Sequence, residues 1–183
     1  MKDSKNDILR FWFEETKPAQ WFQKNEAFDE LIRQRFLPDF ELAMKGIFDG
    51  WMEEAAGALA LVILLDQFPR NMFRGHARAF DGDTRARDVT RYALTKRHDF
   101  VLDTDRKAFL YLPMEHSEAL ADQDKSVELF ATLKDKNPVY FDYAIRHRDV
   151  IVRFGRFPGR NKALGRANTP EEETYLAEQN GGF

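Results

Sequence analysis

Cysteine is absent from the 183 residues of the chain. Its absence excludes disulfide bonds, thiolate catalysis and zinc–thiolate sites, and it fits a reducing compartment. Glycine and proline are sparse, with 10 and 7 residues, and no stretch rich in Gly, Pro or Ser divides the chain. Because domain boundaries usually fall in such linkers, we expect a single domain over residues 1–183.

Neither sign of charge dominates, since 28 basic and 31 acidic residues give a net charge of −3. A chain so balanced has no global field that would attract nucleic acid or an anionic membrane. The longest small-and-apolar run, Ala55 to Leu65, has eleven residues, whereas a helix that spans a bilayer needs about 20. The opening MKDSKNDILRFWFEE lacks the uninterrupted apolar region of a signal peptide. We therefore expect a soluble, cytoplasmic protein without membrane association.

Hydrophobic residues make up 43% of the chain and charged residues 32%, a balance typical of a globular protein. Apolar residues recur at helical spacing almost throughout, and strand patterns are thin. The pattern predicts an all-α fold of seven to eight helices in stacked antiparallel pairs. These helices are expected near residues 4–14, from about 25 on, at 52–67, 83–97, about 104–119, 122–135 and 138–156, and from 170 on.

A short Phe-Pro motif occurs twice, as QFPRN at 67–71 and as RFPGRN at 156–161. Proline removes a backbone donor and clashes with the preceding turn, so each motif is expected to end a helix and to present Arg-Asn from a turn. The alternative is a reused helix stop with a surface arginine. Another local signal lies in Thr169-Pro170-Glu171-Glu172. It combines a capping threonine, a proline at the first helical position and an acid three residues beyond the cap, and predicts the start of the last helix.

Polar side chains stand at three core-facing positions. Asp66 shares a stripe with apolar residues of the third predicted helix, and His116 and His147 lie in the apolar faces of the fifth and seventh. Burying such groups without partners is costly, so we expect them to meet one another, or an arginine, where the helices converge. Together with Glu115 they are the candidate catalytic residues. The alternative is a closed buried network that only specifies helix packing.

Positive charge concentrates in residues 137–166, where six Arg and one Lys accompany two Asp, giving +5. Guanidinium groups bind carboxylates and phosphates with paired donors, so this segment is expected to line an anion-binding groove. The alternative is a solvated face with local ion pairs such as Arg146–Asp149. The candidate ligand-binding residues are Gln67, Arg70, Asn71, Glu118, Arg148, Asp149, Arg153, Arg156, Arg160 and Asn161.

No motif of known catalytic or metal-binding mechanism is complete. His147-Arg148-Asp149 copies part of a kinase catalytic loop, without its asparagine or a glycine-rich phosphate loop. Glu115-His116-Ser117-Glu118 lacks the two histidines of a zinc peptidase helix. The four histidines show no recognised ligand spacing, so we expect neither a metal centre nor a cofactor.

Three long motifs, LLDQFPRNMFRG, FLYLPMEHSE and HRDVIVRFGRFPGRNKALGRANTPEE, resemble the uncharacterised bacterial family catalogued as domain of unknown function 924. The likeness covers essentially the whole chain. It implies a tetratricopeptide-like all-helical fold, and no established activity, substrate or cofactor. Gly159 is one departure, because family members are expected often to carry histidine there. This departure weakens any mechanism that needs a third imidazole in the loop.

The leading hypothesis is a helical-repeat-like binding protein whose internal Asp/Glu/His/Arg pocket holds an anionic small molecule or a peptide carboxylate. A hydrolase is the first alternative, in which His116 or His147 acts as general base, a carboxylate orients it and an arginine stabilises developing negative charge. No nucleophile is evident, because Ser117 lacks an elbow motif. Net acidity and the absence of a recognition module weigh against nucleic acid as a partner. The sequence does not set the oligomeric state.

Overall fold

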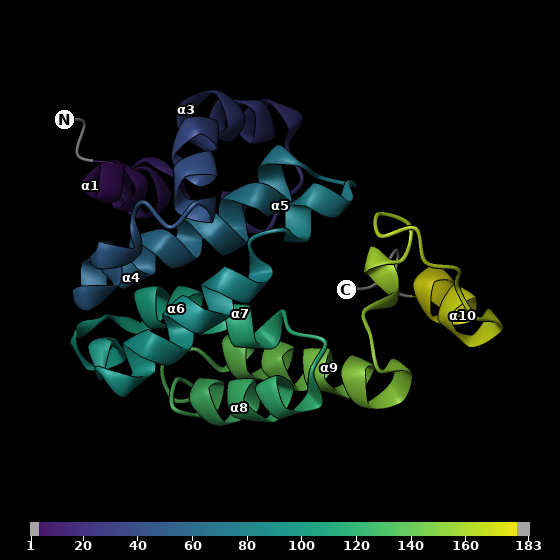
Figure 1. The fold of residues 1–183 in the computed structure, drawn as a ribbon. Helices are drawn as coiled ribbons and strands as arrows, with labels where there is room; N and C mark the ends of the chain where they lie inside the picture. The colour runs from purple at the N-terminus through teal and green to yellow at the C-terminus, as the bar shows by residue number, and fades with distance from the viewer. Residues whose placement is uncertain (1–3, 179–183) are drawn as a thin grey trace. The chain divides into compact units, whose positions relative to one another are not determined.

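The computed structural model describes residues 4–178, and every regular element in that range is helical (Figure 1). The all-α prediction is confirmed. The chain forms two compact units: the first contains the described residues up to 74 and residues 78–113, and the second contains 75–77 and the described residues from 114 on. The expectation of a single domain stays a prediction. None of the helices in the described range combines the length and the hydropathy of a bilayer-spanning segment.

The α-helices of the first unit are α1 (Ser4–Arg10), α2 (Pro18–Trp21), α3 (Glu26–Met44), α4 (Ala55–Val62), α5 (Phe68–Met72), α6 (Asp83–Thr95) and α7 (Thr104–Glu115), whose last two residues belong to the second unit. The second unit continues with α8 (Leu120–Ala131), α9 (Pro138–Phe154) and α10 (Pro170–Glu178). Two segments are π-helical, Phe11–Glu15 and Ile63–Gln67. Short 3-10 turns are formed by Asp49–Glu53, Ala77–Phe80, His98–Val101 and Pro158–Arg160.

The core of the first unit is built from aromatic rings, which accounts for many of the 17 phenylalanines of the chain. Trp12 is completely buried in the π-helical turn that follows α1. Its ring centroid lies 6.3 Å from that of Phe28 and 5.6 Å from those of Phe68 and Phe109. Such ring pairs are favourable beyond the area that they bury. Helices α3, α5 and α7 are therefore joined to the end of α1 through one ring cluster.

The expectation of one helix over 52–67 that ends at Phe68-Pro69 is wrong. Helix α4 passes into the π-helical turn, and α5 continues from Phe68 through Pro69. Proline is tolerated in the first turn of a helix, where its missing N–H group needs no intrahelical partner. The π turn is closed by a bond across five residues, from the Phe68 N–H to the Ile63 carbonyl oxygen. Helix α5 therefore begins with Pro69 in its first turn.

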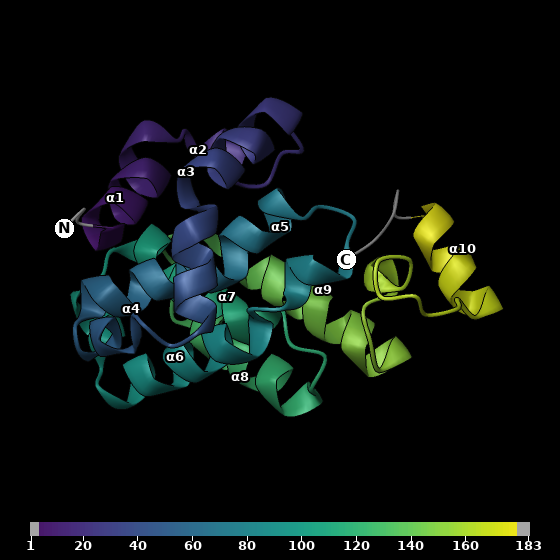
Figure 2. The same cartoon turned by 45° about the horizontal axis from the view of Figure 1, so that its top comes forward.

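Helices α8 and α9 of the second unit run antiparallel, side by side (Figures 1 and 2). The ring centroids of Phe130 and Tyr140 are 6.4 Å apart near one end of the pair. Further along, the Arg148 Nε donates to Asp124 Oδ1 at 2.6 Å. These two contacts define the antiparallel register. Phe130, late in α8, meets Tyr140, early in α9, and Asp124, early in α8, meets Arg148, later in α9.

Capping residues set the bounds of the last two helices. The Asn137 side chain accepts the Val139 N–H at 3.2 Å at the start of α9. Gly155 ends this helix in the left-handed conformation, with φ of 69°. At the start of α10, Thr169 Oγ1 accepts the Glu172 N–H at 3.2 Å and the Glu172 carboxylate accepts the Thr169 N–H at 2.7 Å. This reciprocal pair is the capping box that the sequence predicts.

Candidate functional site

Asp66 lies in the π-helical turn of the first unit and is completely buried. Its Oδ2 accepts from Gln67 Nε2 at 2.6 Å, and its Oδ1 lies 3.2 Å from Arg70 Nη1. The same guanidinium donates to both carboxylate oxygens of Asp83, at 2.9 and 3.2 Å. Burial alone would lower the pKa of Arg70, but the two carboxylates raise it above its usual value. The buried charge of Asp66 is therefore matched within its own unit.

Asn71, from the same Phe-Pro motif, also bonds to a carboxylate of the first unit. Its Nδ2 donates to Asp29 Oδ1 at 2.7 Å, and Arg74 donates to both oxygens of Asp29, at 2.6 and 2.8 Å. Burial would raise the pKa of Asp29, but the hydrogen bonds from Arg74 and Asn71 lower it below its usual value. Asn71 thus ties α5 to α3, and Arg74, two residues after α5 ends, binds the same carboxylate.

In the second unit, Glu115 ends α7 and faces His147 of α9. The Glu115 Oε1 lies 3.3 Å from His147 Nδ1, and the two side chains are 4% and 10% exposed. The same Nδ1 lies 2.9 Å from the carbonyl oxygen of Tyr143. Since both neighbours accept hydrogen bonds, Nδ1 is the nitrogen that carries the proton. A carboxylate and a carbonyl therefore orient this imidazole.

His116 departs from its expected place, because α7 ends one residue before it and the side chain is partly exposed. A helix face predicted from spacing alone does not reveal where the helix ends. The ring still reaches the same neighbourhood, with its centroid 6.2 Å from that of His147. Asp66 belongs to the first unit and the two histidines to the second. Their predicted meeting with Asp66 stays a prediction.

The second Phe-Pro motif completes this neighbourhood. Pro158 begins a 3-10 turn, and the buried Phe157 ring packs edge-on to His147 with centroids 5.6 Å apart. The Arg160 guanidinium lies 4.6 Å from the Phe157 ring centroid, and its Nη2 donates to the carbonyl oxygen of His116 at 2.8 Å. We call Glu115, His116, His147, Phe157 and Arg160 the histidine cluster.

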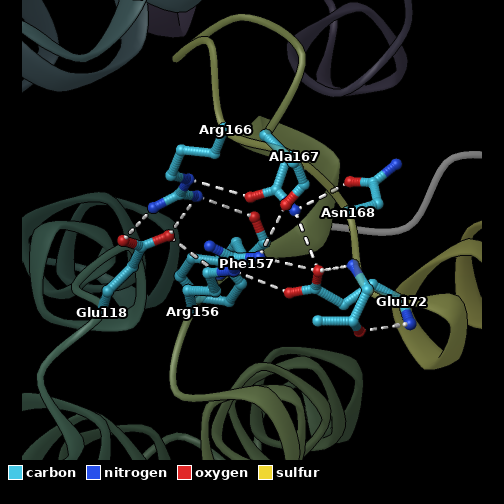
Figure 3. A network of polar contacts seen from close by, with 9 residues as sticks. Glu118, Arg156, Phe157, Arg166, Ala167, Asn168 and Glu172 are labelled. Atoms are coloured by element: carbon cyan, nitrogen blue, oxygen red, sulfur yellow. Dashed lines mark hydrogen bonds and ion pairs between the residues drawn. The ribbon is translucent and has the colours of Figure 1, made fainter.

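Glu118 connects two segments beside the histidine cluster (Figure 3). Its Oε1 accepts the Phe157 N–H at 2.8 Å, and its two oxygens accept from both terminal nitrogens of Arg166, at 2.8 and 2.9 Å. Burial would raise the pKa of Glu118, but Arg166 and the Phe157 N–H lower it below its usual value. The third nitrogen of the Arg166 guanidinium, Nε, donates to Asn161 Oδ1 at 2.8 Å.

Glu172 of α10 is the second carboxylate of this network (Figure 3). It accepts two hydrogen bonds from Arg156, at 2.7 and 2.8 Å, and one from Asn161 Nδ2 at 3.3 Å. The Arg156 bonds, and then the Thr169 N–H, lower the pKa of Glu172 to about 2 although burial opposes them. Two predicted ligand-binding residues, Arg156 and Asn161, thus bind a carboxylate of the chain itself.

Two more arginines of the predicted groove also pair with carboxylates of the chain. Arg148 is bonded to Asp124, and the exposed Arg153 donates to Glu171 Oε1 at 2.8 Å. Asp149 is exposed on α9. The predicted binding residues Gln67, Arg70 and Asn71 lie in the first unit, and the others lie in the second. Of the arginine set, Arg160 alone belongs to the histidine cluster as defined above.

Sequence reasoning missed two residues that organise the second unit. Gln123 of α8 is completely buried, and its Nε2 donates to the carbonyl oxygens of Glu115 and Ser117 at 2.6 Å each. Arg166 lies in the positive segment that is expected to line an anion-binding groove, but it binds Glu118 of the chain itself with two nitrogens. No local pattern marks either residue, because each partner lies in a different helix or loop. Within residues 4–178, no three His, Asp or Glu side chains gather closely enough to hold a metal ion.

Residues 8–180 match the profile of a family described as a bacterial protein of unknown function, DUF924. A solved structure of a protein of unknown function from Agrobacterium tumefaciens, ATU0120, is also similar. The two chains are 42% identical with a TM-score of 0.90, and the similarity covers 95% of this chain and 97% of the other. None of the curated proteins matches this sequence. These comparisons bring no activity, ligand or partner with them.

Proposed function

We propose a function from the premise that the chain belongs to the bacterial protein family of unknown function DUF924, as its three long motifs indicate. The family name supplies no activity, so the proposal starts from the histidine cluster of the second unit. The protein binds an anionic small molecule or a peptide carboxylate there.

One observation carries the proposal: His116, His147 and Arg160 come together from three separate segments. The Arg160 guanidinium donates to the main-chain carbonyl oxygen of His116, and its N–H groups lie in one plane, as do the oxygens of a carboxylate. The Phe157 ring, 4.6 Å from the guanidinium carbon, helps to hold this plane in one orientation. Imidazoles add donors when they are protonated. A carboxylate or phosphate is the chemical group that such donors recognise.

Ion pairs within the chain bear on which arginines belong to the proposed binding site. Arg148, Arg153 and Arg156 each have a carboxylate of the chain within hydrogen-bond distance. An external anion at Arg156 would have to displace the buried Glu172 and leave that carboxylate without its cation. The pairs of Arg148 and Arg153 are exposed to solvent, where an ion pair contributes little. The wider arginine groove is therefore not part of the proposed binding site, which rests on the convergence of the histidine cluster alone.

Calorimetric titration with inorganic phosphate, and with a short acidic peptide that has a free carboxyl terminus, tests this function. We expect Arg160→Gln to weaken binding at least about tenfold, because a hydrogen bond to a charged group contributes ~1.5–3 kcal/mol. Lys125→Gln is the matched control, since it removes one positive charge of the same unit from an exposed pair with Glu128. Equal affinity of wild type and Arg160→Gln, or no binding to either probe, would refute the proposal.

A hydrolase is the second candidate, favoured by the contacts of His147. With its Nδ1 held by Glu115 and the Tyr143 carbonyl, Nε2 is the basic nitrogen of the neutral ring, as in a general base oriented by a carboxylate. A panel of esters and phosphoesters tests it. We expect turnover that is lost in His147→Ala and reduced in Glu115→Gln. Turnover unchanged in His147→Ala, or none across the panel, would exclude this candidate.

The proposal also includes the location of the protein in the cell and the way its helices stack. A cytoplasmic location is supported by the absence of cysteine, which fits a reducing compartment. A tetratricopeptide-like stacking is supported by the antiparallel pairing of α8 and α9. Cell fractionation followed by immunoblotting tests the location, and recovery of the protein outside the cytoplasmic fraction would overturn it.

A further inference from the structure

A half-exposed tyrosine adjoins the histidine cluster. Tyr143 lies on α9, one turn before His147, and is 45% exposed. The Tyr143 ring centroid is 6.5 Å from that of His147. The guanidinium carbon of Arg146 lies 5.5 Å from the Tyr143 ring centroid. The cluster thus has an aromatic surface on the side where α9 meets solvent.

The rings of this region form a connected set. His147 is in ring contact with Tyr143, with Phe157 and with His116. Tyr143 is the member of this set with the largest solvent-exposed surface, since Phe157 is completely buried and His147 nearly so. A partly exposed aromatic ring can bind another planar ring by stacking, and a guanidinium that lies over it, as that of Arg146 does, attracts an anionic substituent on the bound ring.

We propose, building on the binding function above, that the ligand is a planar aromatic molecule that carries an anionic group. Its ring packs on Tyr143, and its phosphate or carboxylate is bound by Arg160 and the imidazoles of the histidine cluster. Arg146, on the same turn of α9 as Tyr143, contributes positive charge at the rim. The aromatic ring would then determine specificity, whereas the anionic group supplies the contact common to all ligands.

Three probes of equal charge type separate the two parts of the ligand: inorganic phosphate, phenyl phosphate and cyclohexyl phosphate. We expect wild type to bind phenyl phosphate about tenfold more tightly than inorganic phosphate, as stacking on one aromatic side chain predicts. Cyclohexyl phosphate has a ring of similar size without π electrons. Its affinity should therefore exceed that of inorganic phosphate by clearly less.

Substitutions at Tyr143 test the ring directly. The Tyr143→Leu variant keeps an apolar side chain, and its main chain still presents the carbonyl that His147 contacts. We expect its affinity for phenyl phosphate to fall to its own affinity for inorganic phosphate, so that the advantage of the ring is lost. Tyr143→Phe should retain that advantage. Val139→Ala is the matched control, since Val139 is 55% exposed one turn earlier on the same helix.

The outcomes distinguish this inference from the function on which it rests. If phosphate binds but phenyl phosphate shows no advantage, or if Tyr143→Leu keeps the advantage, the aromatic specificity is overturned and the anion site stands. If neither phosphate nor phenyl phosphate binds wild type, both proposals fail. Equal loss in Val139→Ala and Tyr143→Leu would likewise overturn the role of the tyrosine ring.

Discussion

Replacing Glu172 with glutamine tests the network that joins the start of α10 to the end of α9 (Figure 3). The Glu172 residue is 2% exposed, and its carboxylate accepts two hydrogen bonds from Arg156 and one from the Thr169 N–H. The Arg156 bonds contribute most to lowering the pKa of Glu172 from its usual 4.5 to about 2. Glutamine keeps the size of the side chain and removes its charge.

The magnitude follows from this shift in pKa. A pKa difference of one unit corresponds to about 1.4 kcal/mol, so the lowering of the Glu172 pKa from 4.5 to about 2 corresponds to about 3–4 kcal/mol at most. The Arg156 side chain is 29% exposed, and solvent screening reduces the expected effect to about 2 kcal/mol. Because the pKa is lower in the folded protein, this stabilisation is complete above pH 4.5. It is lost as the pH falls from 4.5 towards 2.

Urea unfolding followed by circular dichroism, at pH 7 and at pH 3, measures the effect. We expect Glu172→Gln to lose about 2 kcal/mol of unfolding free energy at pH 7, and less than half of that difference to remain at pH 3. Glu171→Gln is the control, because Glu171 is an exposed neighbour whose partner is Arg153. The same loss at both pH values, or an equal loss in the control, would refute the reasoning.

Two further predictions concern local structure in the first unit. A Cβ atom at Gly82 would overlap the carbonyl oxygen of Leu65, so Gly82→Ala should lower the unfolding free energy by about 1–3 kcal/mol in urea. Gly50→Ala, where a Cβ meets nothing within 4 Å, should change it by less than about 1 kcal/mol, and equal effects would contradict the packing argument. Asn25 accepts the Phe28 N–H at 3.0 Å, so Asn25→Ala should lower the melting temperature, with a loss of about 0.5–2 kcal/mol. An unchanged melting temperature would show that the cap contributes nothing.

The helical class could be read from the sequence because apolar spacing and caps are local signals. The 138–156 pattern predicts α9 to within two residues at its end, and the Thr169 capping box predicts the start of α10. The π-helical turn at Ile63–Gln67 could not be predicted, because the run from 55 to 65 is apolar on every side. Without a polar face, a change of helical winding leaves no periodic trace.

The candidate site was predictable one residue at a time and not as a set of partners. Asp66 and His147 are buried, as their core-facing positions in the sequence suggest. The partner of Glu118 is Arg166, which follows it by 48 positions along the chain. Such a contact depends on how helices pack, and spacing within one helix carries no information about it. The sequence therefore identifies candidate charges, and only the fold decides which of them meet.

The π-helical turn at Ile63–Gln67, between α4 and α5, sets the direction in which the side chains of α5 point. Regular winding advances about 100° per residue, and the π turn at Ile63–Gln67 takes one residue more to close. Regular α-helical winding of the same residues would therefore rotate their continuation by roughly that angle. Arg70 and Asn71 would then turn away from Asp83 and Asp29. The winding of one turn thus decides which charged residues of the first unit pair, although the turn itself supplies only one of them.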